Sequence, residues 1–224
     1  MKLSKHQHMQ LFLEKNYITL PQLAKHCGVS EAEILTLENA QCIPGHTYAL
    51  RQILIFSCTG IDEALTENTA LTTTWYYHNS TDLWVKEALL ASKNMNLAAV
   101  AAQVKANFAK QLRKALGDIK TPGCQNFEQA WGYWIDGTWG KCLKEISVDC
   151  LARKELARYN IAEIMQQDPA TISKNTKIKL TAAVKNYIAA SLDFDAYGMR
   201  YLLAEEAIKK FQLDVILDKK YLTD

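Results

Sequence analysis

The stretch from Asn96 to Ile119 carries an apolar residue at every third or fourth position. This spacing places the apolar residues on one stripe of an α-helix that packs against other elements. The stripe consists of Leu97, Val100, Val104, Phe108, Leu112, Leu116 and Ile119. Segments 150–167, 177–192 and 196–212 have similar patterns, and the alternation typical of strands is almost absent. The sequence therefore predicts a mainly α-helical fold, in which a small N-terminal helix-turn-helix-like unit precedes a larger helical domain with at most a short β-hairpin.

Turn-forming and polar residues divide the chain into parts. The Thr-rich run from Leu65 to Thr74 has the composition of a linker. It separates a predicted small domain, residues 1–64, from a predicted helical domain, residues 75–224. The full length of 224 residues is sufficient to bury a sizeable core.

Composition excludes some classes of protein. With 49% hydrophobic and 22% charged residues, the chain has the make-up of a folded globular protein. The net charge of +2 provides no global field that would attract nucleic acid or a membrane. The N-terminal residues lack the pattern of a secretory signal, and no apolar run is long enough to span a bilayer. We therefore expect a cytoplasmic protein with reduced cysteines and no membrane partner.

Segment 18–44 has the pattern of a helix-turn-helix. Leu20 and Leu23 are expected to face the interior, Gly28 to form the turn and Ser30 to cap the second helix. The segment resembles the mercury-resistance (MerR) type of regulator, in which a Leu-Ile-Pro-like corner follows the recognition helix. The matching residues are Gly28–Ser30, Ile34, Glu38, Ile43 and Pro44.

The second helix of this segment lacks the basic residues that the resemblance implies for DNA binding. The family has an arginine, a tyrosine and a second arginine where this chain has Leu35, Thr36 and Asn39. The helix also contains three acids, Glu31, Glu33 and Glu38, and no base. Such a helix would be repelled by phosphates, so no DNA-binding residues are expected, and we interpret the fold as structural or protein-docking.

Segment 127–143 combines three of the five tryptophans with three glycines. Trp131 and Trp134 are three positions apart on a predicted helix and therefore share a face. Asp136 and Gly137 signal a turn, after which an extended run would bring Trp139 back to the first two indoles. The pattern predicts a ligand pocket walled by Trp131, Tyr133, Trp134 and Trp139. The alternative is an aromatic corner of the core.

Several polar side chains are candidates for chemistry at this pocket. Asp136, Lys141 and Cys142 would lie at its mouth, with Lys141 contacting the ligand. Lys154 and Glu155 follow on a helix, where burial would displace their pKa values towards acid–base use. The catalytic candidates are Lys154, Glu155, Asp136 and Cys142, in that order. No phosphate loop, nucleophile elbow or metal motif is present, so no cofactor and no metal site is expected.

The same residues carry a second resemblance. The pattern W..W.DGT.G.C followed by KE is similar to that of an uncharacterised bacterial family labelled natural-product biosynthesis proteins. The matches are Trp131, Trp134, Gly137, Thr138, Gly140, Cys142, Lys154 and Glu155. The resemblance implies a bacterial secondary-metabolite context but brings no reaction and no catalytic residues.

Three functional hypotheses follow. The first is a protein that handles a small molecule in a bacterial biosynthetic pathway, either as an enzyme or as an accessory binder. The second is a MerR-like regulator whose helical domain senses a ligand. The third is a docking protein, because the helix over Lys105–Lys120 is basic and suits an acidic protein partner. A solvated helix face is the simpler interpretation of that basic surface.

Overall fold

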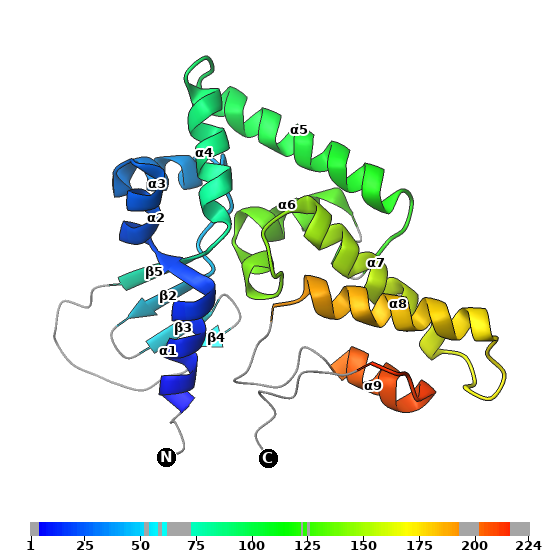
Figure 1. Ribbon diagram of the computed structural model, residues 1–224. Helices are drawn as coiled ribbons and strands as arrows, with labels where there is room; N and C mark the ends of the chain where they lie inside the picture. The colour runs from blue at the N-terminus through cyan, green and yellow to red at the C-terminus, as the bar shows by residue number, and fades with distance from the viewer. Residues whose placement is uncertain are drawn as a thin grey trace.

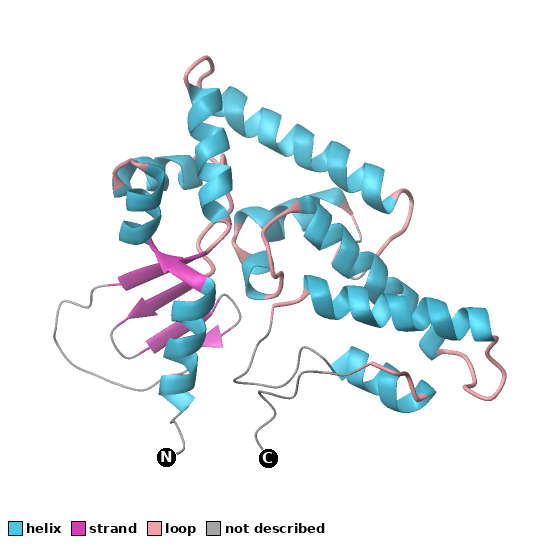
Figure 2. Ribbon diagram, in the orientation of Figure 1, coloured by secondary structure: helices cyan, strands magenta, loops and turns pink. Residues whose placement is uncertain are grey.

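The computed structural model describes residues 5–51, 54–57, 60–61, 73–121, 123–124, 126–192 and 202–215. Helices dominate these residues, as Figures 1 and 2 show, which confirms the predicted mainly α class. A small antiparallel sheet with short helices forms one side of the molecule, and longer helices form the other. Within the described residues, none of the helices combines the length and apolar character that crossing a membrane requires.

The N-terminal part alternates helices with short strands. Its elements are α1 (Lys5–Asn16), β1 (Tyr17–Thr19), α2 (Leu20–Cys27), α3 (Glu31–Asn39), β2 (Tyr48–Arg51), β3 (Leu54–Ser57), β4 (Gly60–Ile61) and β5 (Thr73–His78). The strands pair antiparallel in the order β1-β5-β2-β3-β4, with Tyr17 opposite His78 and Tyr48 opposite Tyr76. The sequence predicted no sheet in this N-terminal part, because its strands are short and the central pairings join distant segments.

Helices α2 and α3 are joined by a tight turn. Gly28 ends α2 with a φ of 70°, a left-handed conformation that glycine adopts without strain. Ser30 begins α3, and its side chain accepts a hydrogen bond from the backbone N–H of Glu33. Leu23 and Ile34 are fully buried. The predicted turn, cap and inward-facing residues are confirmed.

The remaining elements are helices. They are α4 (Thr81–Ser92), α5 (Leu97–Leu116), α6 (Phe127–Ile135), the 3-10 helix η1 (Thr138–Lys141), α7 (Val148–Met165), α8 (Lys174–Ala190) and α9 (Leu202–Phe211). Within the predicted stripe, α5 buries Val100, Phe108, Leu112 and Leu116. The helix ends at Leu116, which leaves Ile119 outside it and exposed. The run after Gly137 was expected to be extended; it is the 3-10 turn η1 instead.

Helix α7 lies at the centre of the helical part. It packs against α5, α8 and α9, and buried residues occupy several of its faces. Another part of the core joins α2 and α3 to β5, α4 and the start of α5. Residues 65–72 of the expected linker lie outside the described residues, whereas Thr73 and Thr74 begin β5. The domain boundaries stay a prediction.

Candidate functional site

The three tryptophans of segment 127–143 lie in the core between α5, α6 and α7. Trp134 is only 1% exposed and packs its ring against Phe108. Trp139 returns to α6, as expected, and its indole N–H donates a 3.0 Å hydrogen bond to the Ala130 carbonyl. Tyr133, which is half-buried, meets the edge of the Trp139 ring. These side chains pack against one another, and ligand binding by them stays a prediction.

The glycines of the same segment allow the N-terminal part to approach closely. A Cβ atom on Gly140 would collide with the Thr47 hydroxyl oxygen. One on Gly137 would collide with the carbonyl oxygen of His46, and Gly137 also has a φ of 75°. The spacing of these two glycines therefore follows from the neighbouring loop, residues 45–47, rather than from a ligand.

Loop 45–47 lies against residues 135–140, and we call this contact the seam. One hydrogen bond joins the two segments of the seam, and a second joins β1 to the same helical segment. The backbone N–H of Gly45 donates to the Ile135 carbonyl at 2.9 Å. The Tyr17 hydroxyl donates to the Gly140 carbonyl at 2.9 Å, and this bond is buried. The tryptophan–glycine segment thus connects the helical part to the sheet.

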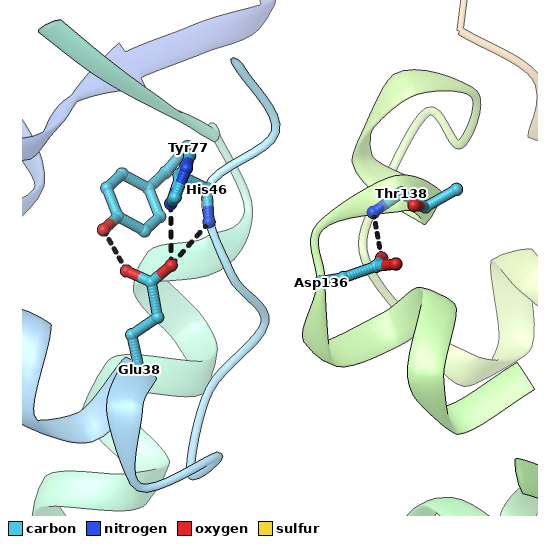
Figure 3. A network of polar contacts seen from close by, with 5 residues as sticks. All are labelled: Glu38, His46, Tyr77, Asp136 and Thr138. Atoms are coloured by element: carbon cyan, nitrogen blue, oxygen red, sulfur yellow. Dashed lines mark hydrogen bonds and ion pairs between the residues drawn. The ribbon is translucent and has the colours of Figure 1, made fainter. Parts of the chain in front are cut away.

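The polar residues of the segment have local partners. The carboxylate of Asp136 accepts a 2.8 Å hydrogen bond from the backbone N–H of Thr138, which closes the turn (Figure 3). The amine of Lys141 lies 5.9 Å from the centre of the Tyr48 ring. Cys142 is half-buried and forms no disulfide. Asp136 and Lys141 are therefore directed to the turn and to the sheet, respectively.

Lys154 and Glu155 are both buried on α7, but they bind different loops. The Lys154 amine donates a 2.7 Å hydrogen bond to the Cys142 carbonyl. Glu155 is 1% exposed and accepts a 3.0 Å hydrogen bond from the backbone N–H of Gly123. Arg158, one turn further along α7, lies 3.5 Å from its other oxygen. Both side chains therefore form hydrogen bonds with backbone groups of neighbouring loops. A catalytic role for either stays a prediction.

The structure reveals a polar cluster that sequence reasoning missed. Glu38, at the end of α3, turns inward and accepts hydrogen bonds from the His46 ring at 2.8 Å and from the Tyr77 hydroxyl (Figure 3). The His46 ring also stacks on Trp75. The sequence indicates Glu38 as one of the three acids of the second helix and as a matching residue of the resemblance. Its match to a framework position of the resemblance was the signal that indicated a structural role.

The contacts of this cluster stabilise the charge on Glu38. Burial opposes ionisation, but the hydrogen bonds from His46 and Tyr77 prevail and hold the pKa of Glu38 below its usual value. Burial and the adjacent Glu38 charge raise the pKa of Tyr77, which remains a neutral donor. Because His46 belongs to loop 45–47, the hydrogen bond to Glu38 holds this loop in place at the seam.

An open cavity of about 290 Å³ lies between the C-terminal half of α5 and the start of α6. Its apolar lining comes from Ala109, Leu112, Leu116, Ile119 and Phe127. Gly117, Cys124 and Asn126 complete the uncharged part. Phe127 belongs to the tryptophan–glycine segment, but the three tryptophans of that segment are not among the residues that line the cavity.

Three charged side chains also line the cavity: Arg113, Asp118 and Lys120. All three are exposed, and none forms an ion pair with another described residue. Lys105, on the same basic helix, differs because it pairs with Glu128 at 2.9 Å. The basic helix and the aromatic segment, which were separate features in the sequence, therefore meet at this cavity.

The inner wall of the cavity is chemically inert. Cys124 is buried there, and burial together with the nearby Glu155 charge raises the pKa of its thiol to about 12. Such a thiol stays protonated at neutral pH and is a poor nucleophile. Within the described part of the chain, no group of three His, Cys, Asp or Glu side chains is placed to hold a metal ion.

Comparison with known proteins gives a family but no activity. A family of unknown function (DUF6058) matches residues 94–212, more than half of the chain, and the chain belongs to this family. The match includes α5 to α9 and hence the whole cavity. No curated protein and no solved structure matches the chain. The expected likenesses to natural-product biosynthesis proteins and to MerR-type regulators have no support from these comparisons.

Proposed function

We propose that this member of the DUF6058 family binds a small organic molecule in the cavity between α5 and α6. The observation that carries the proposal is the cavity itself, which is open to solvent, mainly apolar and edged by charged groups. Ligand sites commonly combine an apolar lining with a few polar groups that orient the ligand. The volume of about 290 Å³ suits a ligand no larger than two fused rings with a polar substituent.

The lining supports binding more than catalysis. Lys154, Asp136 and Cys142, three of the four side chains that the sequence indicated as catalytic candidates, are not among the residues that line the cavity. Glu155, the fourth, does not line the cavity either and is bound by the Gly123 N–H and by Arg158. The protein is therefore proposed to act as an accessory binder rather than as an enzyme.

The biosynthetic context and the location are parts of this proposal. The natural-product context rests on the tryptophan–glycine motif alone, whose Gly137 and Gly140 also have a packing role at the seam. The MerR-like alternative rests on α2 and α3, whose exposed face presents Glu31 and Glu33. A cytoplasmic location is supported by the free thiols of the five described cysteines, since a reducing compartment keeps thiols unpaired. An acidic protein partner of the basic helix also stays a prediction.

Binding of a neutral aromatic probe tests the proposal. We expect 2-naphthamide to bind the wild-type protein in an isothermal titration. Ala109→Phe fills the cavity and should weaken binding by at least about tenfold, which corresponds to about 1.4 kcal/mol. The matched control is Ala106→Phe, an exposed position of α5 that does not line the cavity. If the wild type binds neither this probe nor its carboxylate and phosphate analogues, or if both variants bind the probe as the wild type does, the proposal is wrong.

A further inference from the structure

We propose that the natural ligand of this cavity is a small monocarboxylic acid whose carboxylate lies between Arg113 and Lys120. This inference rests on the proposed function, because it specifies the chemistry of a ligand in the same cavity. The apolar residues of the lining, such as Leu112 and Phe127, would hold the hydrocarbon body of the acid. The two basic side chains would hold its charged end.

The two basic side chains are available to a ligand. Arg113 and Lys120 both line the cavity and form no ion pair with any described residue. Lys105, which pairs with Glu128, shows that a basic residue of this helix takes an internal partner where one lies nearby. A guanidinium presents its N–H groups in a fork that matches the two oxygens of a carboxylate. Arg113 is therefore the group expected to orient the ligand.

The balance of charge at the cavity favours a single negative charge on the ligand. Arg113 and Lys120 contribute two positive charges, and Asp118 contributes one negative charge. The last carbonyl groups of α5, which ends at Leu116, add partial negative charge close to the same place. A single carboxylate charge matches the remaining positive charge more closely than the two charges of a phosphate ester do. The structure thus points to a carboxylic acid rather than to a phosphate ester.

A set of three probes with the same ring system tests the charge. 2-Naphthoate, 2-naphthamide and 2-naphthyl phosphate differ mainly in the group attached to the naphthalene. We expect 2-naphthoate to bind about tenfold more tightly than the neutral amide and more tightly than the phosphate. The preference for 2-naphthoate over the amide should shrink as the salt concentration rises, because salt screens exposed charges.

Single substitutions locate the carboxylate. Arg113→Gln and Lys120→Gln should each weaken 2-naphthoate about threefold and leave the amide unchanged. Lys114→Gln is the matched control, because Lys114 is exposed on α5 but does not line the cavity. Asp118→Asn should act in the opposite direction and strengthen 2-naphthoate about threefold, since it removes a like charge.

The results separate this inference from the proposed function. If the amide binds in the cavity as tightly as 2-naphthoate, the carboxylate inference is wrong and the cavity remains a ligand site. If the phosphate binds most tightly, the charge argument is wrong. If Lys114→Gln weakens 2-naphthoate as much as Arg113→Gln does, only the general positive field of the helix acts, and the assignment of the carboxylate to Arg113 fails. If none of the probes binds, the proposed function itself fails.

Discussion

The backbone N–H of Gly45 donates a 2.9 Å hydrogen bond to the carbonyl of Ile135, which joins the loop after α3 to the end of α6. A Cβ atom on Gly45 would lie 2.5 Å from that same carbonyl oxygen. The two backbones are therefore as close as glycine permits. Across the same contact, Gly137 and Gly140 leave no room for a Cβ atom against loop 45–47. This packing explains two of the three glycines of the tryptophan-rich segment, and it leads to the first prediction.

Alanine at two glycines of one segment should have opposite effects on stability. Gly140→Ala places a methyl group against the buried Thr47 side chain and should lower the free energy of unfolding by about 1–3 kcal/mol. Gly132→Ala, in the middle of α6, meets open space and should raise the free energy by about 0.5–1 kcal/mol through helix propensity. Urea unfolding measures both. Equal effects at the two positions would contradict the packing role of Gly140.

His78 should make stability depend on pH between about 4 and 6.5. Burial lowers the pKa of its ring to about 4, whereas the unfolded chain has the usual value of 6.5. The unfolded state therefore binds the proton first, and stability falls as pH decreases through this window by up to about 1.4 kcal/mol per unit. His78→Gln should flatten the dependence measured by urea unfolding between pH 5 and 7.

The control for this pH dependence is His26→Gln, at an exposed position of α2. It should leave the pH dependence as in the wild type. An NMR titration of the His78 ring gives an independent reading in the folded protein. A midpoint near 6.5 in the folded state would contradict the account.

The Glu38 cluster should contribute more to stability than an ordinary surface carboxylate does. Glu38→Gln removes the charge that His46 and Tyr77 bind and should cost about 1–3 kcal/mol in unfolding free energy at pH 7. Because the pKa of Glu38 is lowered in the fold, the loss should fade as pH falls below the ordinary value of 4.5 and vanish once the folded carboxyl is protonated as well. Glu31→Gln, an exposed position on the same helix, should have little effect. Equal losses of unfolding free energy for the two variants would contradict the stabilising role of the Glu38 contacts with His46 and Tyr77.

Two substitutions of Glu155 should separate a structural role from a catalytic one. Glu155→Gln keeps an oxygen that accepts the hydrogen bond from the Gly123 N–H, so most of the stability should remain. Glu155→Ala leaves that N–H buried without a partner and should cost about 1–3 kcal/mol more than the Gln variant in urea unfolding. Equally large losses for both variants would show that the negative charge beside Arg158, rather than the hydrogen bond to Gly123, is what α7 requires there.

The helices could be predicted because their signals are local. The stripe from Leu97 to Leu116 repeats within the sequence, and so do the Gly28 turn and the Ser30 cap. The sheet could not be predicted in the same way. Tyr17 of β1 pairs with His78 of β5, and a local sequence pattern does not indicate a partner strand so far along the chain.

The candidate site shows the same division. The basic residues of α5 and the aromatic residues of α6 were visible in the sequence as two separate features. The cavity between them exists because the chain turns back after Gly117, so that Phe127 comes to lie beside Leu112 and Arg113. The roles of Gly137 and Gly140 likewise depend on loop 45–47, almost a hundred residues earlier.

The most direct test of the central claim, that the cavity is a ligand site, is a crystal structure of the protein with 2-naphthoate. The account predicts naphthalene rings between Leu112 and Phe127, with the carboxylate facing Arg113 and Lys120. A saturated crystal with an empty cavity, or with the probe bound among Trp131, Trp134 and Trp139 instead, would contradict it.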